Sequence, residues 1–166
     1  MIDFGALLKN KNLGERFYLT KEGMEAIKKE YERLITIKLA QTKGEIPQFL
    51  HSDELNQEYF DFQNDIDLLE ARMADLKYII DNSELIKKPS KDKQNIVQLG
   101  ARVLVEINGE IDEFRIVSSI EANPSLGMIS NESPVGKALL GHKVGDEIII
   151  SSPVRTCYKI KKIKYS

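Results

Sequence analysis

The fold of the first half of this chain is decided by residues 59–80, YFDFQNDIDLLEARMADLKYII. Apolar residues recur there in alternating steps of three and four: Tyr59, Phe62, Ile66, Leu69, Met73, Leu76 and Ile80. This spacing is typical of the seam of a coiled coil, along which one helix packs against another. The stretch therefore predicts a long helix that needs a helical partner.

The partner is predicted from residue 20 onward. A threonine that can cap a helix is followed there by apolar residues with the same spacing: Thr20, Met24, Ile27, Tyr31 and Leu34. Only residues 44–52, including Pro47, separate the two helices, and so short a connection makes them antiparallel. The hairpin would be roughly 36–45 Å long, at about 1.5 Å per residue. A two-helix rod has no globular core, so its far end must project into solvent or into a partner.

The pattern changes after residue 86. Residues 87–98, KKPSKDKQNIVQ, are polar and charged, which predicts a linker. Apolar residues then alternate with period 2, and Asn108-Gly109 is a strong hairpin signal. Ser133 followed by Pro134 predicts the start of one short helix. We therefore expect an α+β protein with a flexible N-terminal arm at 1–17, an antiparallel coiled coil at 18–86, and a small antiparallel sheet domain at 99–166.

Composition excludes several classes of protein. The single cysteine, Cys157, rules out an intramolecular disulfide, and with only two histidines it argues against structural zinc. No apolar run is long enough to span a membrane, and the N-terminus does not resemble a secretion signal, so we expect a cytoplasmic protein with no membrane partner. Residues 1–86 carry a net charge of −6 and residues 87–166 a net charge of +4. Neither half has the strong basic character of a general nucleic-acid binder.

Three stretches resemble the Gre family of bacterial transcript-cleavage factors. They are YLTKEGMEAIKKEYERL at 18–34, NQEY at 56–59, and IVSSIEANPSLGMISNESPVGKALLGHKVGDEIII at 116–150. The resemblance implies an antiparallel coiled coil joined to a C-terminal domain of FKBP-like topology. It also implies a monomeric partner of bacterial RNA polymerase, with the C-terminal domain on the rim of the secondary channel and the rod inside the channel.

In that family, two acids at the tip of the rod help to hold a second Mg²⁺ in the polymerase active site, where backtracked RNA is cut. The protein would then be a cofactor of the nuclease activity of the polymerase and not an enzyme by itself. The family's acid positions fall on Ser52 and Leu55, neither of which is a carboxylate. Asp53 and Glu54 lie next to them and are the candidate catalytic residues and Mg²⁺ ligands, within the polymerase complex only.

A simpler interpretation of the same residues stays open. Ser52 followed by Asp53 and Glu54 is also an ordinary helix start, with a capping serine and acids at the positive end of the helix dipole. Two functions are therefore predicted: a cleavage-stimulating elongation factor, or a channel regulator that inhibits the polymerase without stimulating cleavage.

The resemblance assigns further residues. Candidate polymerase contacts are Glu132, Ser133, Pro134 and Glu58; candidate contacts to the 3′ end of the nascent RNA are Lys28, Lys29, Arg33 and Lys38. Ser133-Pro134 equally fits a plain helix cap, and the lysines equally fit pairing with neighbouring glutamates. Prolyl isomerase activity is a weaker prediction, because the second domain has no Trp and few aromatic residues, and a fold alone does not imply an activity.

Overall fold

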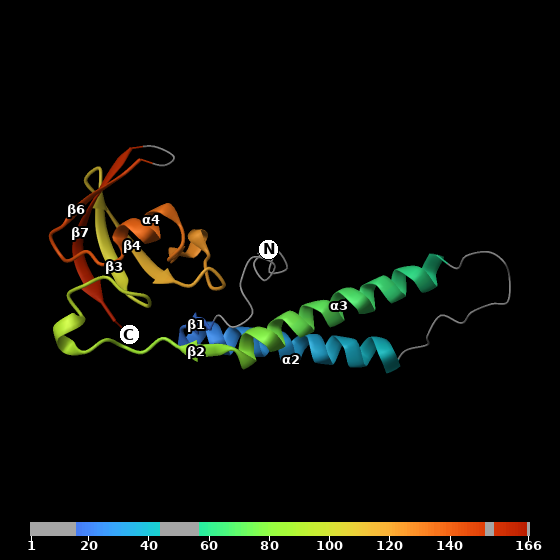
Figure 1. The fold of residues 1–166 in the computed structure, drawn as a ribbon. Coiled ribbons are helices and arrows are strands. Elements are labelled where there is room, and N and C mark those ends of the chain that lie inside the picture. Colours follow the sequence, from blue (N-terminus) through green and yellow to red (C-terminus); the bar gives the residue numbers. More distant parts are fainter. Residues whose placement is uncertain (1–15, 44–56, 152–154, 166) are drawn as a thin grey trace, which may run out of the picture. The chain divides into compact units, whose positions relative to one another are not determined.

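The structure is a computed structural model that describes residues 16–43, 57–151 and 155–165 (Figure 1). The described chain divides into two compact units. One contains Arg16–Lys21 and the chain from Glu84 onward, and the other is Glu22–Ser83. No helix in the described ranges has the length and apolar character needed to cross a membrane.

The predicted helical hairpin is confirmed. Helix α2 covers Lys21–Lys43 and helix α3 covers Gln57–Asp81 (Figure 1). Contacts along the pair run in opposite directions: Glu30 is bonded to Arg72, and Lys38 to Glu70. Among the apolar seam residues, the side chains of Ile27 and Leu76 are buried, while the others are half-buried. This is the expected result for two helices that have only each other to pack against.

The C-terminal part is a curled five-stranded sheet with one short α-helix. Its strands are β3 (Arg102–Ile107), β4 (Glu110–Val117), β5 (Met128–Ser130), β6 (Glu147–Ile150) and β7 (Thr156–Lys164), in the order β5-β4-β3-β7-β6. Helix α4 covers Pro134–Leu139. Short 3₁₀ turns lie at Lys91–Lys93 and Pro124–Leu126. The hairpin predicted at Asn108-Gly109 is confirmed, since both residues have positive φ, as the tight turn between β3 and β4 requires.

One pairing differs from the antiparallel sheet that we predicted. Strand β5 runs parallel to β4, with Arg115 opposite Met128 and Val117 opposite Ser130, so the sheet is mixed. A parallel neighbour requires the chain to return to the same end of the sheet, and residues 118–127 make this return. Alternation of apolar residues predicts strands but not their relative direction, which is why the sequence missed it.

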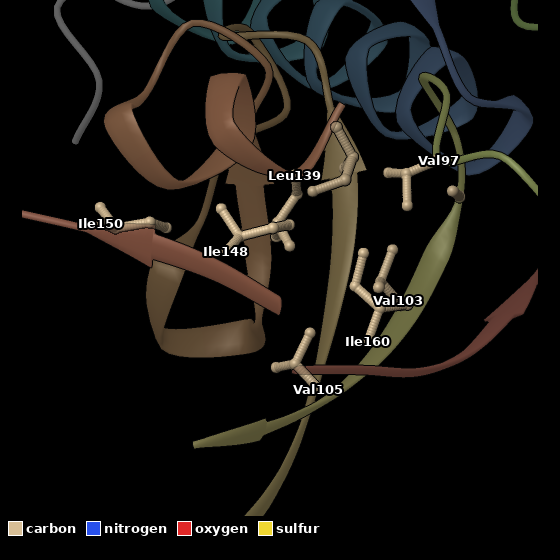
Figure 2. Packing of buried hydrophobic residues seen from close by; sticks show 9 residues of the cluster. Val97, Val103, Val105, Leu139, Ile148, Ile150 and Ile160 are labelled. Atoms are coloured by element: carbon tan, nitrogen blue, oxygen red, sulfur yellow. The ribbon is translucent and has the colours of Figure 1, made fainter. Parts of the chain in front are cut away.

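The core of the sheet domain lies between the strands and α4, where Val103, Val105, Leu139, Ile148 and Ile160 point toward one another (Figure 2). Val97 is part of the same cluster and is 1% exposed. Its N–H donates to the carbonyl of His142, and its carbonyl accepts from Gly141. The end of the predicted linker is therefore packed into the domain, because one valine among polar neighbours was enough to anchor it.

A second, two-stranded sheet was not predicted. Strand β1 (Phe17–Leu19) pairs with β2 (Ser83–Leu85), and Phe17 and Leu19 are buried. Beside it lies Glu121, a buried acid. Its carboxylate accepts the backbone N–H of Thr20 at 2.9 Å and the Thr20 hydroxyl. Both donors belong to the residue that immediately precedes α2, so Glu121 fixes the point at which the rod helix begins.

We expect Glu121→Ala to lower the free energy of unfolding by about 1–3 kcal/mol, because two buried donors would lose a charged acceptor. Thermal and urea unfolding followed by circular dichroism would measure this. The control is Glu147→Ala, whose exposed ion pair with Lys159 should contribute little to stability. Equal effects of the two substitutions would show that Glu121 has no special role.

The turn before β6 is held by Asp146. Its carboxylate accepts the Lys143 N–H at 2.9 Å and lies 3.0 Å from Nδ1 of His142. The Lys143 N–H, followed by the His142 side chain, lowers the pKa of Asp146 below its ordinary 3.8.

A lowered carboxyl pKa adds stability above the unfolded pKa, and this contribution is lost as the pH falls through the folded pKa. Asp146→Asn should therefore lower the melting temperature at neutral pH. The difference from wild type should shrink as the pH falls below about 4. Melting curves of both proteins across acidic pH test this, and a difference that stays constant with pH would contradict it.

Candidate functional site

The loop that leads from β5 into α4 is the best-defined candidate site. Ser133 is the N-cap of α4: its hydroxyl accepts from the Gly136 N–H at 3.0 Å and donates to the Ser130 carbonyl at 2.7 Å. The Ser130 hydroxyl in turn accepts from the Glu132 N–H and lies 3.1 Å from the Ser119 hydroxyl. These bonds hold the loop in one conformation before any partner arrives.

Gly136 makes this arrangement possible. A Cβ atom at position 136 would lie 2.0 Å from the Ser130 carbonyl oxygen, which is a backbone atom that cannot swing aside. Sequence reasoning did not single out Gly136. Glycine lowers the stability of a helix, so a glycine inside a predicted helix suggests that a side chain would not fit there. Its position in the predicted helix was therefore the available sign that another backbone segment lies close to it.

The three loop residues predicted as polymerase contacts divide into two kinds. Glu132 and Pro134 are exposed, whereas Ser133 is half-buried and its hydroxyl is used within the loop. Ser133 thus fits the cap interpretation, while its neighbours on each side face outward. The serine therefore shapes the loop, the flanking residues form its surface, and their contact with the polymerase stays a prediction.

On the rod, the predicted RNA contacts also divide. Lys28, Lys29 and Arg33 are exposed, and no ion pair of theirs occurs within the described residues. Lys38 instead pairs with Glu70 of the opposite helix at 2.6 Å. Lys29 and Arg33 are four residues apart and so share one helix face.

The competing interpretation pairs these bases with neighbouring glutamates of the same helix, whereas the partner of Lys38 is on the opposite helix. Of the neighbouring glutamates, Glu30 is bonded to Arg72 across the seam, and Glu25 and Glu32 form no ion pair with these bases within the described residues. The RNA-contacting role of these four bases stays a prediction.

The tip acids Asp53 and Glu54 lie outside the described residues, as do Ser52 and Leu55. Glu58 is in the first turn of α3. In the part of the chain that the structure covers, no group of three or more histidine, cysteine or acidic residues could hold a metal ion. The prediction of these residues as metal ligands stays a prediction.

Comparison with known proteins decides the family. The family profile described as "Transcription elongation factor, N-terminal" matches residues 17–85, and the one described as "Transcription elongation factor, GreA/GreB, C-term" matches residues 91–165. The chain belongs to the GreA/GreB family of transcription elongation factors. The resemblance inferred from three short motifs is thereby confirmed over nearly the whole chain.

Two relatives of known family agree with this membership. Transcription elongation factor GreA of Thermomicrobium roseum is 38% identical over 141 residues, which cover 84% of this chain and 90% of the relative. GreA of Clostridium acetobutylicum is 38% identical over 156 residues, covering 90% of this chain and 98% of the relative. Among solved structures, GreA factor homolog 1 (Gfh1) of Thermus thermophilus is 30% identical, covering 90% of this chain and 99% of that one, with a TM-score of 0.40.

We expect Gly136→Ala to destabilise the C-terminal domain by about 1–3 kcal/mol, as overpacking against fixed backbone does. Lys137→Ala, at the next and exposed position of α4, is the matched control and should change stability by no more than about 0.5 kcal/mol. Urea unfolding measures both variants. If Gly136→Ala is as stable as the wild type, the close approach to Ser130 is not a constraint on the loop.

Proposed function

We propose that this elongation factor binds bacterial RNA polymerase through the secondary channel and stimulates Mg²⁺-dependent cleavage of backtracked RNA. The observation that carries the proposal is the helical hairpin, in a chain that belongs to a family of elongation factors. Residues 44–56, which include Asp53 and Glu54, join its two helices. A narrow rod is suited to reach a buried active site that a globular domain cannot enter. The factor would act in the cytoplasm as a monomer and would have no nuclease activity alone.

In this proposal the C-terminal domain makes the docking contact with the polymerase. The rigid loop presents Glu132 and Pro134 to the rim of the channel, with Ser133 holding the loop in shape. Because these residues are held before binding, little conformational entropy is lost when the partner docks. Glu58, in the first turn of the returning helix, is a further proposed polymerase contact.

The rod supplies contacts to RNA. Lys28, Lys29 and Arg33 are exposed and form no ion pair within the described structure, so they are available to bind the phosphates of the transcript near its 3′ end. Lys38, which is held by Glu70, is the weakest of the four candidates.

The donor chemistry of the tip fits Mg²⁺, which prefers carboxylate oxygens and phosphate oxygens and keeps several waters. Two carboxylates are too few to bind it tightly, so Asp53 and Glu54 would complete a site that the polymerase largely provides. When bound, the ion supplies an activated water and charge stabilisation for phosphodiester cleavage. The part of this chain is to bring two negative charges to that position.

A second function is favoured by a specific feature of the sequence. Serine and leucine occupy the family's acid positions at 52 and 55. A tip without correctly placed carboxylates would still fill the channel, and the protein would then regulate or inhibit the polymerase without stimulating cleavage.

A stalled, backtracked polymerase complex distinguishes the two functions. We expect the wild-type factor to accelerate cleavage, and we expect Asp53→Asn with Glu54→Gln to reduce the stimulated rate by about tenfold or more, as loss of groups that support a metal does. Gel analysis of the shortened transcript measures the rate.

The matched control is Asp65→Asn with Asp67→Asn, which removes two exposed acids from α3 and should leave the rate unchanged. Slower nucleotide addition without cleavage would establish the inhibitory function instead. Failure to bind the polymerase at all would overturn both.

A further inference from the structure

The apolar burial of the helical hairpin is concentrated at one end. Ile27 of α2 and both Leu76 and Ile79 of α3 are buried. Farther along the two helices, in residues 28–43 and 59–75, every residue that the structure describes is at least partly exposed to solvent. These two segments are called the outer rod below. In Figure 1 the helices lie close together at the buried end and diverge away from it.

The seam of α2 also becomes polar in the outer rod. Lys38 and Gln41 continue the spacing of the apolar seam residues that precede them. The side-chain oxygen of Gln41 is buried without a hydrogen-bond partner among the described residues, which costs free energy. The hydroxyls of Thr36 and Thr42 donate to carbonyls four residues earlier in α2, and such bonds slightly destabilise a helix. Apolar packing is therefore weak in the outer rod, and a different interaction is needed to hold its helices together.

The two helices carry opposite charges in the outer rod. Residues 28–43 contain five bases and two acids, a net charge of +3, whereas residues 59–75 contain five acids and one base, a net charge of −4. Opposite charges on two paired helices attract each other, as the charged residues beside a coiled-coil seam do. This general attraction favours closure of the outer rod, but it does not by itself select which residues meet.

Two residues whose charges oppose this general pattern are bonded to each other. Glu30 is one of the two acids in the basic segment, and Arg72 is the single base in the acidic segment. Nε and Nη2 of Arg72 both donate to one carboxylate oxygen of Glu30, at 2.9 and 2.6 Å. The side chains of Arg72 and Glu30 are 26% and 43% exposed, so the contact is partly shielded from solvent. Two charge-assisted hydrogen bonds in such a position contribute more than a single exposed ion pair does.

A second ion pair of the outer rod helps to specify the same alignment. The Lys38 ammonium donates to Glu70 at 2.6 Å, so a polar residue of the α2 seam takes its partner from the acidic segment. If α3 moved by one heptad in one direction, Asp65 would take the place of the base opposite Glu30. If it moved by one heptad in the other direction, Lys77 would take the place of Glu70 opposite Lys38. Either shift brings like charges together, so both are disfavoured.

We propose that the outer rod is held closed by these cross-helix charges, and that Glu30 and Arg72 are positioning residues for the segment at its end. Residues 44–56 are joined to the outer ends of both helices, so their location is limited by how firmly those ends are held together. The importance of this for catalysis rests on the proposed function, in which Asp53 and Glu54 must reach a metal in the polymerase. The closure itself is a property of the free protein and can be measured without the polymerase.

Distances between two spin labels on the full-length free protein test the closure. The labels are attached at Ala40→Cys in α2 and Asn64→Cys in α3, both exposed positions, in a Cys157→Ser background. We expect Glu30→Arg to shift the distance distribution to longer distances, because it places two like charges together. The shift is expected even though the substitution raises the net charge of the basic segment from +3 to +5, which would strengthen a general attraction. Glu30→Arg combined with Arg72→Glu restores an opposite pair and should return the distances to those of the wild type.

The matched control is Glu32→Arg, which changes the charge of α2 equally at an exposed position that forms no ion pair within the described residues. It should leave the distances unchanged, and circular dichroism should show that all variants are helical. Unchanged distances in Glu30→Arg would overturn the proposal. So would equal opening by Glu32→Arg, or a double substitution that stays open, because the effect would then not come from the contact between Glu30 and Arg72.

The backtracked polymerase complex tests the positioning role with the same variants. We expect Glu30→Arg to lower the cleavage rate at saturating factor by about tenfold or more, because small misplacements of reacting groups are costly. The concentration that gives half-maximal stimulation should stay unchanged, and the double substitution should recover the rate. A variant that is open in the free protein but cleaves at the wild-type rate would overturn the positioning role. If the wild type does not stimulate cleavage, the proposed function fails, while the spin-label distances still decide whether charge closes the outer rod.

Discussion

Neither long helix of this protein can bury its apolar seam alone, and the structure of the first half follows from that constraint. Helices α2 and α3 have only each other, so most seam residues remain half-buried and complete burial occurs only at positions such as Ile27 and Leu76. Polar contacts across the seam, from Arg72 to Glu30 and from Lys38 to Glu70, continue the pairing where apolar contact is thin. A rod of two helices is narrow, which suits the proposed role of reaching into a partner.

The C-terminal domain follows a different principle. Its core is a continuous apolar cluster between the sheet and α4, and it can therefore hold a surface loop rigidly (Figure 2). There is no room for a side chain at Gly136, because the Ser130 carbonyl lies against it. Hydrogen bonds of the Ser119, Ser130 and Ser133 hydroxyls also hold the loop before α4. Stiffness at this point is useful for docking, because a loop that is already in its bound conformation loses less entropy when it binds. In the proposed function, the hairpin would enter the polymerase and the C-terminal domain would dock on its surface.

The effect of a charged side chain depends on whether an opposite charge lies beside it. The chain is nearly neutral overall, yet both units contain cations with carboxylate partners and cations without them in the described structure. On β7, Lys159 and Lys161 belong to ion pairs that brace neighbouring strands, whereas Lys162 and Lys164 lie in an excess of positive charge. Exposed ion pairs contribute little to stability, so the main effect of these two pairs is to offset positive charge at their own end of β7.

The sequence by itself determined the two-part architecture, because a period of three and four sustained over three heptads predicts a helix packed along a helical partner, and because Asn108-Gly109 specifies a tight hairpin. It also determined the family, through motifs that the family profiles confirm. Only the tertiary structure decided the parallel pairing of β5, the place of Val97 in the core, the contact of Glu121 with Thr20, and which lysines have partners. These features join residues far apart in the chain, and local periodicity carries no information about which distant segments will meet.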